Sequence, residues 1–263
     1  MASVPSTALD DPLTLNLRLQ GHLSAVYALT QNSRHLFASP LGPFQFAGRS
    51  GYLPRLVFFG PLASDVAWRI AFLAGFDRHD WRSSHALLAL AEQLAEDSER
   101  GHGLDVTFFP LVDAAGALLG SPDRALGGRP WKDAQEPELR LLERDARVRR
   151  YHGFVRLETG DLGEEVASIR ICGAVAELFA PDLALITSED TDAFPVRFES
   201  GLTDGDRNSG PLSFADHLPF TPFELTLRIP GAWPDATYRR VVVNVLQRFL
   251  WRYRAFQAYG QNL

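Results

Sequence analysis

The residues best suited to chemistry follow short apolar runs. The segment 76–82 (FDRHDWR) comes after such a run and precedes a helical pattern, and it carries Asp77, His79 and Asp80. Paired carboxylates and an imidazole suit several metals, so this segment is a candidate site for a hard cation or a polar ligand. The structural alternative is a charged loop in which Asp80 stabilises the helix start through the helix dipole. His85, inside that helix two turns from Asp77, is expected at the surface or in packing.

Arg228 is a second candidate. The segment 223–229 (FELTLRI) alternates apolar and polar residues, which places Glu224, Thr226 and Arg228 on one face of a predicted strand. Burial of a guanidinium on that face is costly unless carboxylates pair with it. We therefore expect Arg228 either to have acidic partners or to extend its charged end into water at a sheet edge.

Other catalytic motifs are missing from the sequence. It has no glycine-rich dinucleotide or phosphate loop, no Gly-x-Ser-x-Gly elbow and no His-Glu-x-x-His helix. The single cysteine, Cys172, lies in an apolar stretch predicted to begin a helix, where a buried thiol is favoured over a nucleophile. One cysteine also excludes an internal disulfide framework and is typical of a reducing compartment.

Strands and helices alternate in the predicted elements that position these residues. Apolar runs bounded by proline and glycine predict strands buried on both faces, and apolar residues three and four apart predict helices. Ser83 and Ser84 are expected to cap the first of these helices, which should end near Gly101. A long loop is predicted over 113–130. The predicted strands are 55–60, 68–75, 105–112, 153–157 and 223–229, and the predicted helices are 83–101, 136–150, 172–179 and 236–258.

This alternation predicts one α/β domain over residues 1–263, with a central mixed, largely parallel sheet and helices on both faces. Residues 1–20 are expected to be disordered or peripheral. Ligands of such sheets bind beyond the carboxyl ends of the strands. The segments 76–81, 113–129 and 158–163, together with the end of the strand at Arg228, are therefore expected to meet there.

Charge and hydropathy narrow the class of protein. The 263 residues include 26 Lys and Arg against 32 Asp and Glu, a formal net charge of −6, so nucleic acid is not expected as a partner. No run of about 20 apolar residues suits a membrane span, and residues 1–12 lack the apolar region of a signal peptide. A cytoplasmic protein is therefore expected, of undetermined oligomeric state.

Several segments, in order along the chain, resemble the motifs of one family. Residues 55–80 are similar to two strands followed by Ala-Gly-(Ile/Val)-His-Gly-Asp-Glu, and 109–116 (FPLVDAAG) to Pro-(Leu/Val)-Val-Asn-Pro-x-Gly. Residues 124–131 look like an arginine followed by Asp-Leu-Asn-Arg-x-(Phe/Trp), 155–163 like a strand ending in Leu-His, and 222–230 like the strand of a catalytic glutamate. This order resembles the zinc carboxypeptidases, in the branch near succinylglutamate desuccinylase and aspartoacylase.

The resemblance implies a zinc site, and the chain departs from it at every metal and catalytic position. Asp77 and Asp80 stand where the family has its first two ligands, His and Glu, and Glu158 stands at the third ligand, His. Arg228 replaces the glutamate that would activate water, and an arginine cannot be deprotonated to act as a base. Three carboxylates would also offset the charge by which zinc lowers the pKa of its water to about 7.

No metal or cofactor is therefore expected, although zinc is the metal of the family. We hypothesise that the Arg228 guanidinium occupies or borders the former metal position, where Asp77, Asp80 and Glu158 hold it by charge-assisted hydrogen bonds.

The leading functional prediction is a non-catalytic homologue. Its retained Arg124 and Arg129 would bind a carboxylate-bearing peptide or small molecule, because arginine recognises carboxylates bidentately. The structural alternative is that both only rigidify their loop. One alternative is a metal-dependent peptidase or N-acyl amino acid deacylase, which would place the three carboxylates and His79 around a harder metal and use Glu224 as base. Another is an interaction or scaffold protein that uses its acidic surface.

Overall fold

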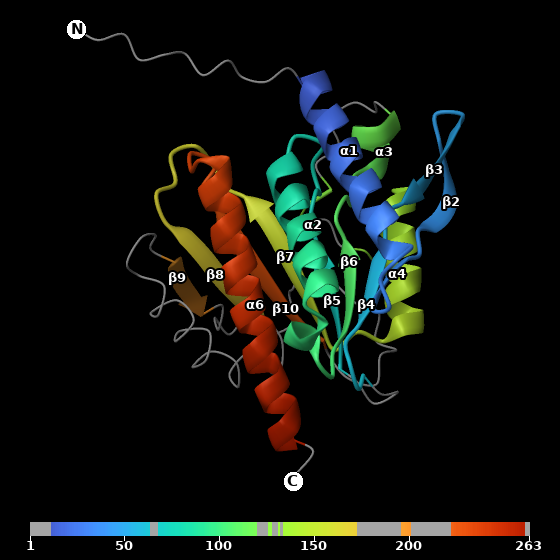
Figure 1. Ribbon diagram of the computed structural model, residues 1–263. Helices are drawn as coiled ribbons and strands as arrows, with labels where there is room; N and C mark the ends of the chain where they lie inside the picture. The colour runs from blue at the N-terminus through green and yellow to red at the C-terminus, as the bar shows by residue number, and fades with distance from the viewer. Residues whose placement is uncertain are drawn as a thin grey trace, which may run out of the picture.

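A central sheet organises the chain, in a computed structural model that describes residues 12–63, 68–119, 126–127, 131, 134–172, 196–200 and 222–260 (Figure 1). The helices are α1 (Pro12–Thr30), α2 (Trp81–Glu96), the 3₁₀ turn η1 (Ser98–Gly101), α3 (Ala114–Leu119), α4 (Pro137–Arg149) and α6 (Asp235–Gly260). The strands are β1 (Leu36–Ala38), β2 (Leu41–Phe46), β3 (Arg49–Leu53), β4 (Leu56–Phe59), β5 (Arg69–Leu73), β6 (Asp105–Phe109), β7 (Gly153–Thr159), β8 (Ala167–Cys172), β9 (Val196–Ser200) and β10 (Phe223–Ile229).

Eight strands form the main sheet in the order β1-β4-β6-β5-β7-β10-β8-β9, while β2 and β3 form a separate hairpin. The four central strands β6, β5, β7 and β10 run parallel. The flanking strands introduce antiparallel pairs, β4 with β6, β1 with β4, and β8 with β10. The predicted α/β class with a mixed, largely parallel sheet is confirmed.

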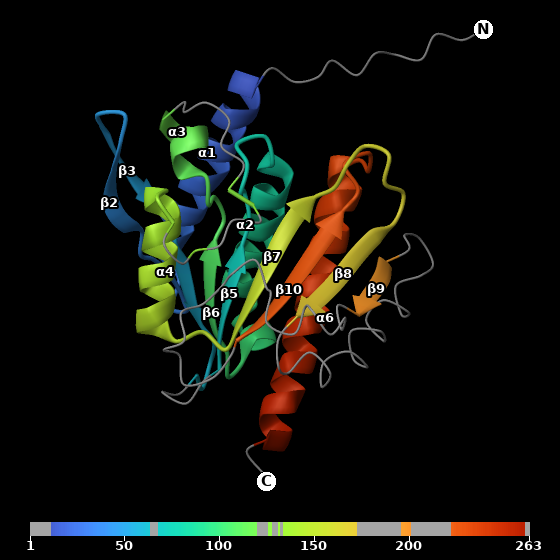
Figure 2. The same cartoon turned by 180° about the vertical axis from the view of Figure 1, so that it is seen from behind.

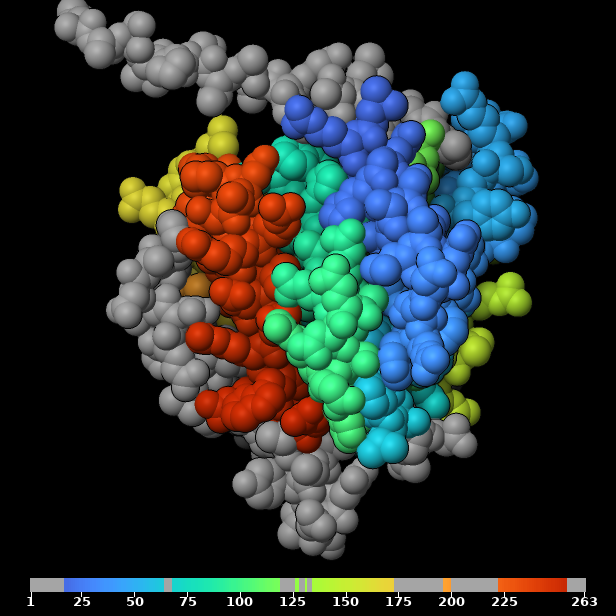
Figure 3. Space-filling view, in the orientation of Figure 1, coloured from blue at the N-terminus to red at the C-terminus, as the bar shows by residue number. Residues whose placement is uncertain are grey.

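Helices cover both faces of the sheet. The helices α1, α2 and α6 lie side by side over one face (Figures 1 and 3), and α4 lies over the other (Figure 2). Strand β5 shows why its sequence is a continuous apolar run: Ile70 and Phe72 pack in the core beneath the three helices, whereas Ala71 and Leu73 pack in the core beneath α4. A strand buried on both faces needs apolar residues at every position.

The boundaries of α2 correct two predictions. The cap is Asp80, whose side chain accepts a hydrogen bond from the Ser83 amide, and not Ser83 or Ser84. Ser83 Oγ instead donates to the Asp80 carbonyl and accepts from the Gly75 amide, which ties the helix start to the end of β5. At its other end the helix stops at Glu96, and η1 continues to Gly101 as a separate turn.

Two further predictions are wrong where the structure describes them. Cys172 is the last residue of β8 rather than the start of a helix, and residues 173–179 lie outside the described part of the chain. The predicted 113–130 loop contains α3 at its start.

The N-terminal segment also differs from its prediction. Residues 12–20, expected to be disordered or peripheral, begin α1, where Leu19 is buried. No helix among the described residues has the length and apolarity of a membrane span.

Candidate functional site

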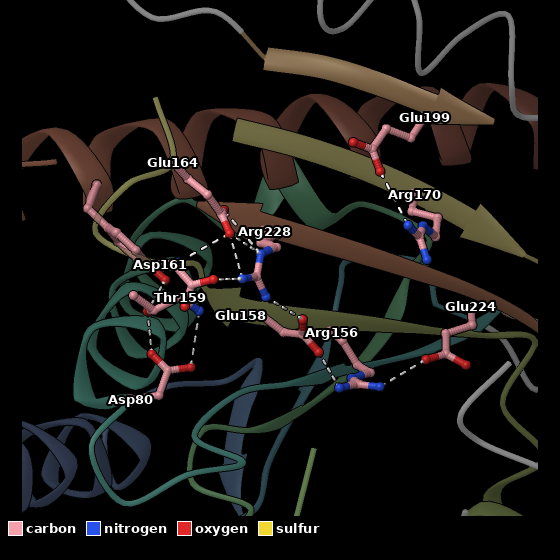
Figure 4. Close-up of polar contacts among 11 residues, drawn as sticks. Asp80, Arg156, Glu158, Thr159, Asp161, Glu164, Arg170, Glu199, Glu224 and Arg228 are labelled. Atoms are coloured by element: carbon pink, nitrogen blue, oxygen red, sulfur yellow. Dashed lines mark hydrogen bonds and ion pairs between the residues drawn. The ribbon is translucent and has the colours of Figure 1, made fainter. Parts of the chain in front are cut away.

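The site lies where β7 and β10 run side by side. Their parallel register sets Arg228 beside Glu158 and Thr226 beside Arg156. Leu225 and Leu227 of β10 point into the core beneath α6, so the intervening polar residues lie on the opposite face of the sheet. Charged side chains therefore meet on that face from two neighbouring strands (Figure 4).

Arg228 is held mainly from the turn after β7. Its guanidinium donates to the Glu164 carboxylate from Nε at 2.9 Å and from Nη2 at 2.6 Å. Asp161 lies 3.3 Å from Nη2, and the Glu158 carboxylate lies 3.7 Å from Nη1 (Figure 4). These contacts raise the pKa of Arg228, and the hydrogen bond from Arg228 lowers the pKa of Glu164. The Arg228 side chain remains 36% exposed, so water reaches this network.

Arg156 precedes Glu158 by two residues on β7, so both side chains lie on the same face of the sheet, and Arg156 forms the buried half of the same network. Its side chain is only 4% exposed, and it bonds to Glu158 through Nη2 and faces Glu224 at 3.5 Å through Nη1. The guanidinium also lies over the Phe76 ring, 4.7 Å from its centroid. Glu158 therefore bridges two arginines, and the network runs from the buried Arg156 to the half-exposed Arg228.

Asp80 makes a different set of contacts. Besides capping α2, its carboxylate accepts a hydrogen bond from the Thr159 hydroxyl, which is also 2.9 Å from the Tyr238 hydroxyl. Burial raises the pKa of Asp80 to about 6, and the hydrogen bonds from Thr159 and Ser83 offset part of that rise. Burial and the nearby Asp80 together raise the pKa of Tyr238.

The turn after β5 holds the other predicted ligand positions. Asp77 accepts a hydrogen bond from the His79 amide at 2.7 Å, and the exposed His79 ring lies 3.1 Å from the Arg78 guanidinium. The turn itself depends on Gly75, whose φ is +63°, and an added Cβ there would come within 2.6 Å of Ser84 Oγ.

The hypothesis for Arg228 is therefore correct for one of its three partners. Glu158 contacts the guanidinium, but Asp77 and Asp80 are engaged in the loop and helix cap that precede α2. Their place around Arg228 is taken by Glu164 and Asp161. The physical reason is proximity: the chain turns back directly after β7, with the Gly160 amide bonded to the Ile229 carbonyl, so acidic residues of that turn reach Arg228 first.

Other predicted site residues have mixed outcomes. Glu224, the base required by the metallohydrolase alternative, is buried against Arg156. Arg124 and Arg129, the predicted carboxylate ligands, lie outside the described residues. Among the residues that are described, no three histidine, cysteine, aspartate or glutamate side chains group as metal ligands. The expectation that no metal binds stays a prediction.

Sequence reasoning missed Arg156 and Glu164. Arg156 had a signal in the sequence, since the period of two places it on the same strand face as Glu158. Glu164 lies one residue beyond the acidic, glycine-containing segment 158–163 that was predicted to follow the strand. Nothing in the sequence indicated which acidic residue of that turn would reach Arg228.

Solved structures share this architecture. The chain is similar to a metallo-carboxypeptidase from Burkholderia cenocepacia, with a TM-score of 0.66 and 13% identity, over 91% of this chain and 69% of that one. It is similar to a metallo-carboxypeptidase from Pseudomonas aeruginosa in complex with (2-guanidinoethylmercapto)succinic acid, with a TM-score of 0.61 and 13% identity, over 86% and 67%. It is also similar to bovine thrombin-activatable fibrinolysis inhibitor in complex with tick carboxypeptidase inhibitor. Here the TM-score is 0.59 and the identity 10%, over 89% of this chain and 96% of that one.

No family model matches the sequence, and no curated protein does. At identities of 10 to 13% the likeness is one of fold. The carboxypeptidase-like fold that the sequence resemblance implied is therefore confirmed.

Proposed function

We propose that this protein is a non-catalytic carboxypeptidase-like protein, in which a protein cation replaces the metal ion of the family. The observation that carries the proposal is the position of Arg228. Its guanidinium lies at the carboxyl ends of β7 and β10, donates hydrogen bonds to Glu164 and forms an ion pair with Glu158. The resemblance implies a catalytic glutamate at this position, and a permanent cation cannot take a proton from water.

The chemistry of the donors supports the same conclusion. The resemblance implies that Asp77, Asp80 and Glu158 stand at the positions of the zinc ligands, and each of these carboxylates already accepts hydrogen bonds within the protein. Catalytic zinc sites combine neutral imidazoles with at most one carboxylate. These residues do not fit zinc.

Binding remains a function that such a site can perform. Arg228 is already neutralised by its own carboxylates, so recognition of a ligand carboxylate falls to Arg124 and Arg129. We propose that they hold the carboxylate of a peptide or small molecule by bidentate hydrogen bonds.

A hydrolysis assay tests the loss of activity. The protein purified from its host, without chelators, is analysed for metal content and assayed against peptides with a free C-terminus and against N-acyl amino acids. We expect metal well below one ion per chain and no turnover. The matched control carries Asp77→His, Asp80→Glu, Glu158→His and Arg228→Glu, the residue types that the resemblance implies, and should bind zinc. One tightly bound metal per wild-type chain together with turnover would contradict the proposal.

Calorimetry tests the binding function separately. Peptides with a free C-terminal carboxylate are titrated into the wild type, and the same peptides with an amidated C-terminus are the control. The free acids should bind and the amides should not, and Arg124→Ala with Arg129→Ala should abolish the difference. Equal binding of acid and amide would refute carboxylate recognition without affecting the proposed loss of catalysis.

A further inference from the structure

A groove beside α4 is the strongest feature outside this site. It has a volume of about 610 Å³ and lies between α4 and the β2–β3 hairpin, which stand next to each other in Figure 2. Phe44, Pro137 and Leu141 contribute its apolar surface. Three arginines, Arg140, Arg144 and Arg147, outnumber the one carboxylate of the lining, Glu143, and Gln45 completes it. The volume corresponds to roughly twenty water molecules in the liquid, which is more than a single acidic group would fill.

The charges of α4 are sorted between the two sides of the helix. Its buried carboxylates are used inside the protein: Glu138 accepts from the Ala115 amide at 3.0 Å, and Asp145 binds Arg55 and the Tyr151 hydroxyl. The three groove arginines are exposed. A chain with a net charge of −6 therefore presents a basic stripe along this one helix.

Two of the three arginines have their charge available. Arg147 pairs with Glu143 of the same helix at 2.6 Å. Within the described part of the chain, Arg140 and Arg144 have no carboxylate within ion-pair distance. An anionic partner could therefore bind both arginines without breaking an existing ion pair, so the cost of breaking one would not reduce its affinity.

The spacing of the arginines indicates the shape of that partner. Positions four and three residues apart lie about 6 Å and 4.5 Å apart along a helix axis. Alternate side chains of an extended peptide point the same way at about 6.6 to 6.8 Å. Acidic side chains at alternate positions of an extended segment would thus face successive arginines, while the intervening side chains could contact Phe44 and Leu141.

We propose that this groove binds an extended acidic segment of a partner protein, with carboxylates at alternate positions and apolar residues between them. The surface lies on α4 and the hairpin, apart from Arg228, and the proposal does not depend on the proposed function. Charge complementarity against an acidic chain identifies the partner's chemistry.

Fluorescence anisotropy with a labelled six-residue peptide of alternating aspartate and leucine tests this proposal. The wild type should bind the peptide, with an affinity that falls as salt is added. Arg140→Ala with Arg144→Ala should weaken binding about tenfold or more, since each exposed pair contributes up to about 1 kcal/mol. The control is Arg34→Ala with Arg239→Ala, which removes two exposed arginines outside the groove and should leave the affinity unchanged.

A charge swap sharpens the experiment. The double variant Arg140→Glu with Arg144→Glu should no longer bind the peptide of alternating aspartate and leucine, and it should bind a peptide of alternating lysine and leucine. Circular dichroism melts confirm that each variant folds. The proposal is overturned if the wild type does not bind, if the control weakens binding as much as the groove variant, or if a block peptide of three aspartates and three leucines binds equally well. Equal binding of a thymidine hexanucleotide would also overturn it, because the groove would then select phosphate charge rather than peptide.

Discussion

Arg156 and Arg228 have similar partners but different access to water. Both contact Glu158, yet the Arg156 side chain is 4% exposed and the Arg228 side chain is 36% exposed. Removing one partner of a buried ion pair leaves an uncompensated charge, whereas water compensates a half-exposed one. Burial rather than the number of ion pairs should therefore decide how much each arginine stabilises the fold.

Alanine substitution of each arginine tests this difference. Arg156→Ala should lower the free energy of unfolding by about 3 to 5 kcal/mol, because it removes a buried guanidinium that contacts two carboxylates, Glu158 and Glu224. Arg228→Ala should lower it by about 1 kcal/mol or less, because water reaches the half-exposed guanidinium and its carboxylates. Denaturant unfolding of the two variants measures both values. Equal losses would show that the network does not divide into buried and solvated halves.

Asp80 should make stability depend on pH. Its pKa is raised from 3.8 to about 6 in the folded protein, so the folded state holds a proton that the unfolded state releases between these values. Its contribution to stability is then full below about pH 4 and falls as the pH rises to 6, by at most about 3 kcal/mol.

The variant Asp80→Asn isolates that contribution. Asparagine retains a cap for α2 but does not titrate. From pH 7 to pH 4.5, the wild type should gain stability relative to the variant, measured by urea unfolding at each pH. Asp97→Asn, at the other end of α2, controls for the loss of one carboxylate. A wild-type-to-variant difference that stays constant with pH would mean that Asp80 is ionised throughout.

At the scale of single residues, the sequence predicted which positions carry charge but not how the charges pair. Glu224, Thr226 and Arg228 do share a strand face, since period two follows from strand geometry alone. Glu164 could not be selected as the main partner of Arg228, because the path of a turn depends on tertiary contacts such as the bond from the Gly160 amide to Ile229.

Among the elements, the docking of α1 on α2 includes a titratable contact. His22 Nδ1 lies 2.7 Å from His85 Nδ1, and the two rings stack with centroids 4.9 Å apart. Only one proton can lie between these nitrogens. His22 also pairs with Glu92, and Arg239 and Asp235 of α6 act on His85 from the other side. Burial, followed by the charge of His22, lowers the pKa of His85 from 6.5 to about 4.

Acid should therefore loosen α1. Between pH 6.5 and 4 the unfolded chain binds a proton at His85 that the folded chain excludes, so this contribution to stability is full above pH 6.5 and is lost as the pH falls. Protection factors of the α1 amides, from hydrogen exchange, should fall over that range more than those of β5. His85→Phe keeps a ring against Trp81 and should remove the effect. The same acid dependence in His85→Phe would exclude His85 as its cause.

The burial of an element decided in part whether the sequence pattern predicted it. Strands β5 and β6 are buried on both faces and were predicted from their apolar runs. Strand β8 was missed although Ser168 and Arg170 alternate with buried Ala167, Ile169 and Ile171 at the period of a strand, the same pattern that predicted β10. Helix α1 was missed because its leucines at 13, 15, 17 and 19 alternate at the period of a strand, and tertiary packing on α2 overrides that pattern.

For the whole molecule, the order of segments was more informative than any single motif. That order indicated the carboxypeptidase-like fold, and solved structures at 10 to 13% identity share it. A core tolerates wide hydrophobic substitution if its patterning is kept, so a fold can persist while the chemical groups of a site change. Function depends on a few side chains, and under the proposed function these are the charged residues at the ends of β5, β7 and β10.

Under the proposed function, the Arg228 guanidinium stands where zinc carboxypeptidases hold their metal ion. A crystal structure of the wild type soaked in zinc, with diffraction recorded at the zinc absorption edge, tests this claim most directly. We expect Arg228 bonded to Glu164 and Glu158, and no anomalous peak among Asp77, Asp80 and Glu158. A zinc peak coordinated by those three carboxylates, with the Arg228 side chain turned away, would contradict it.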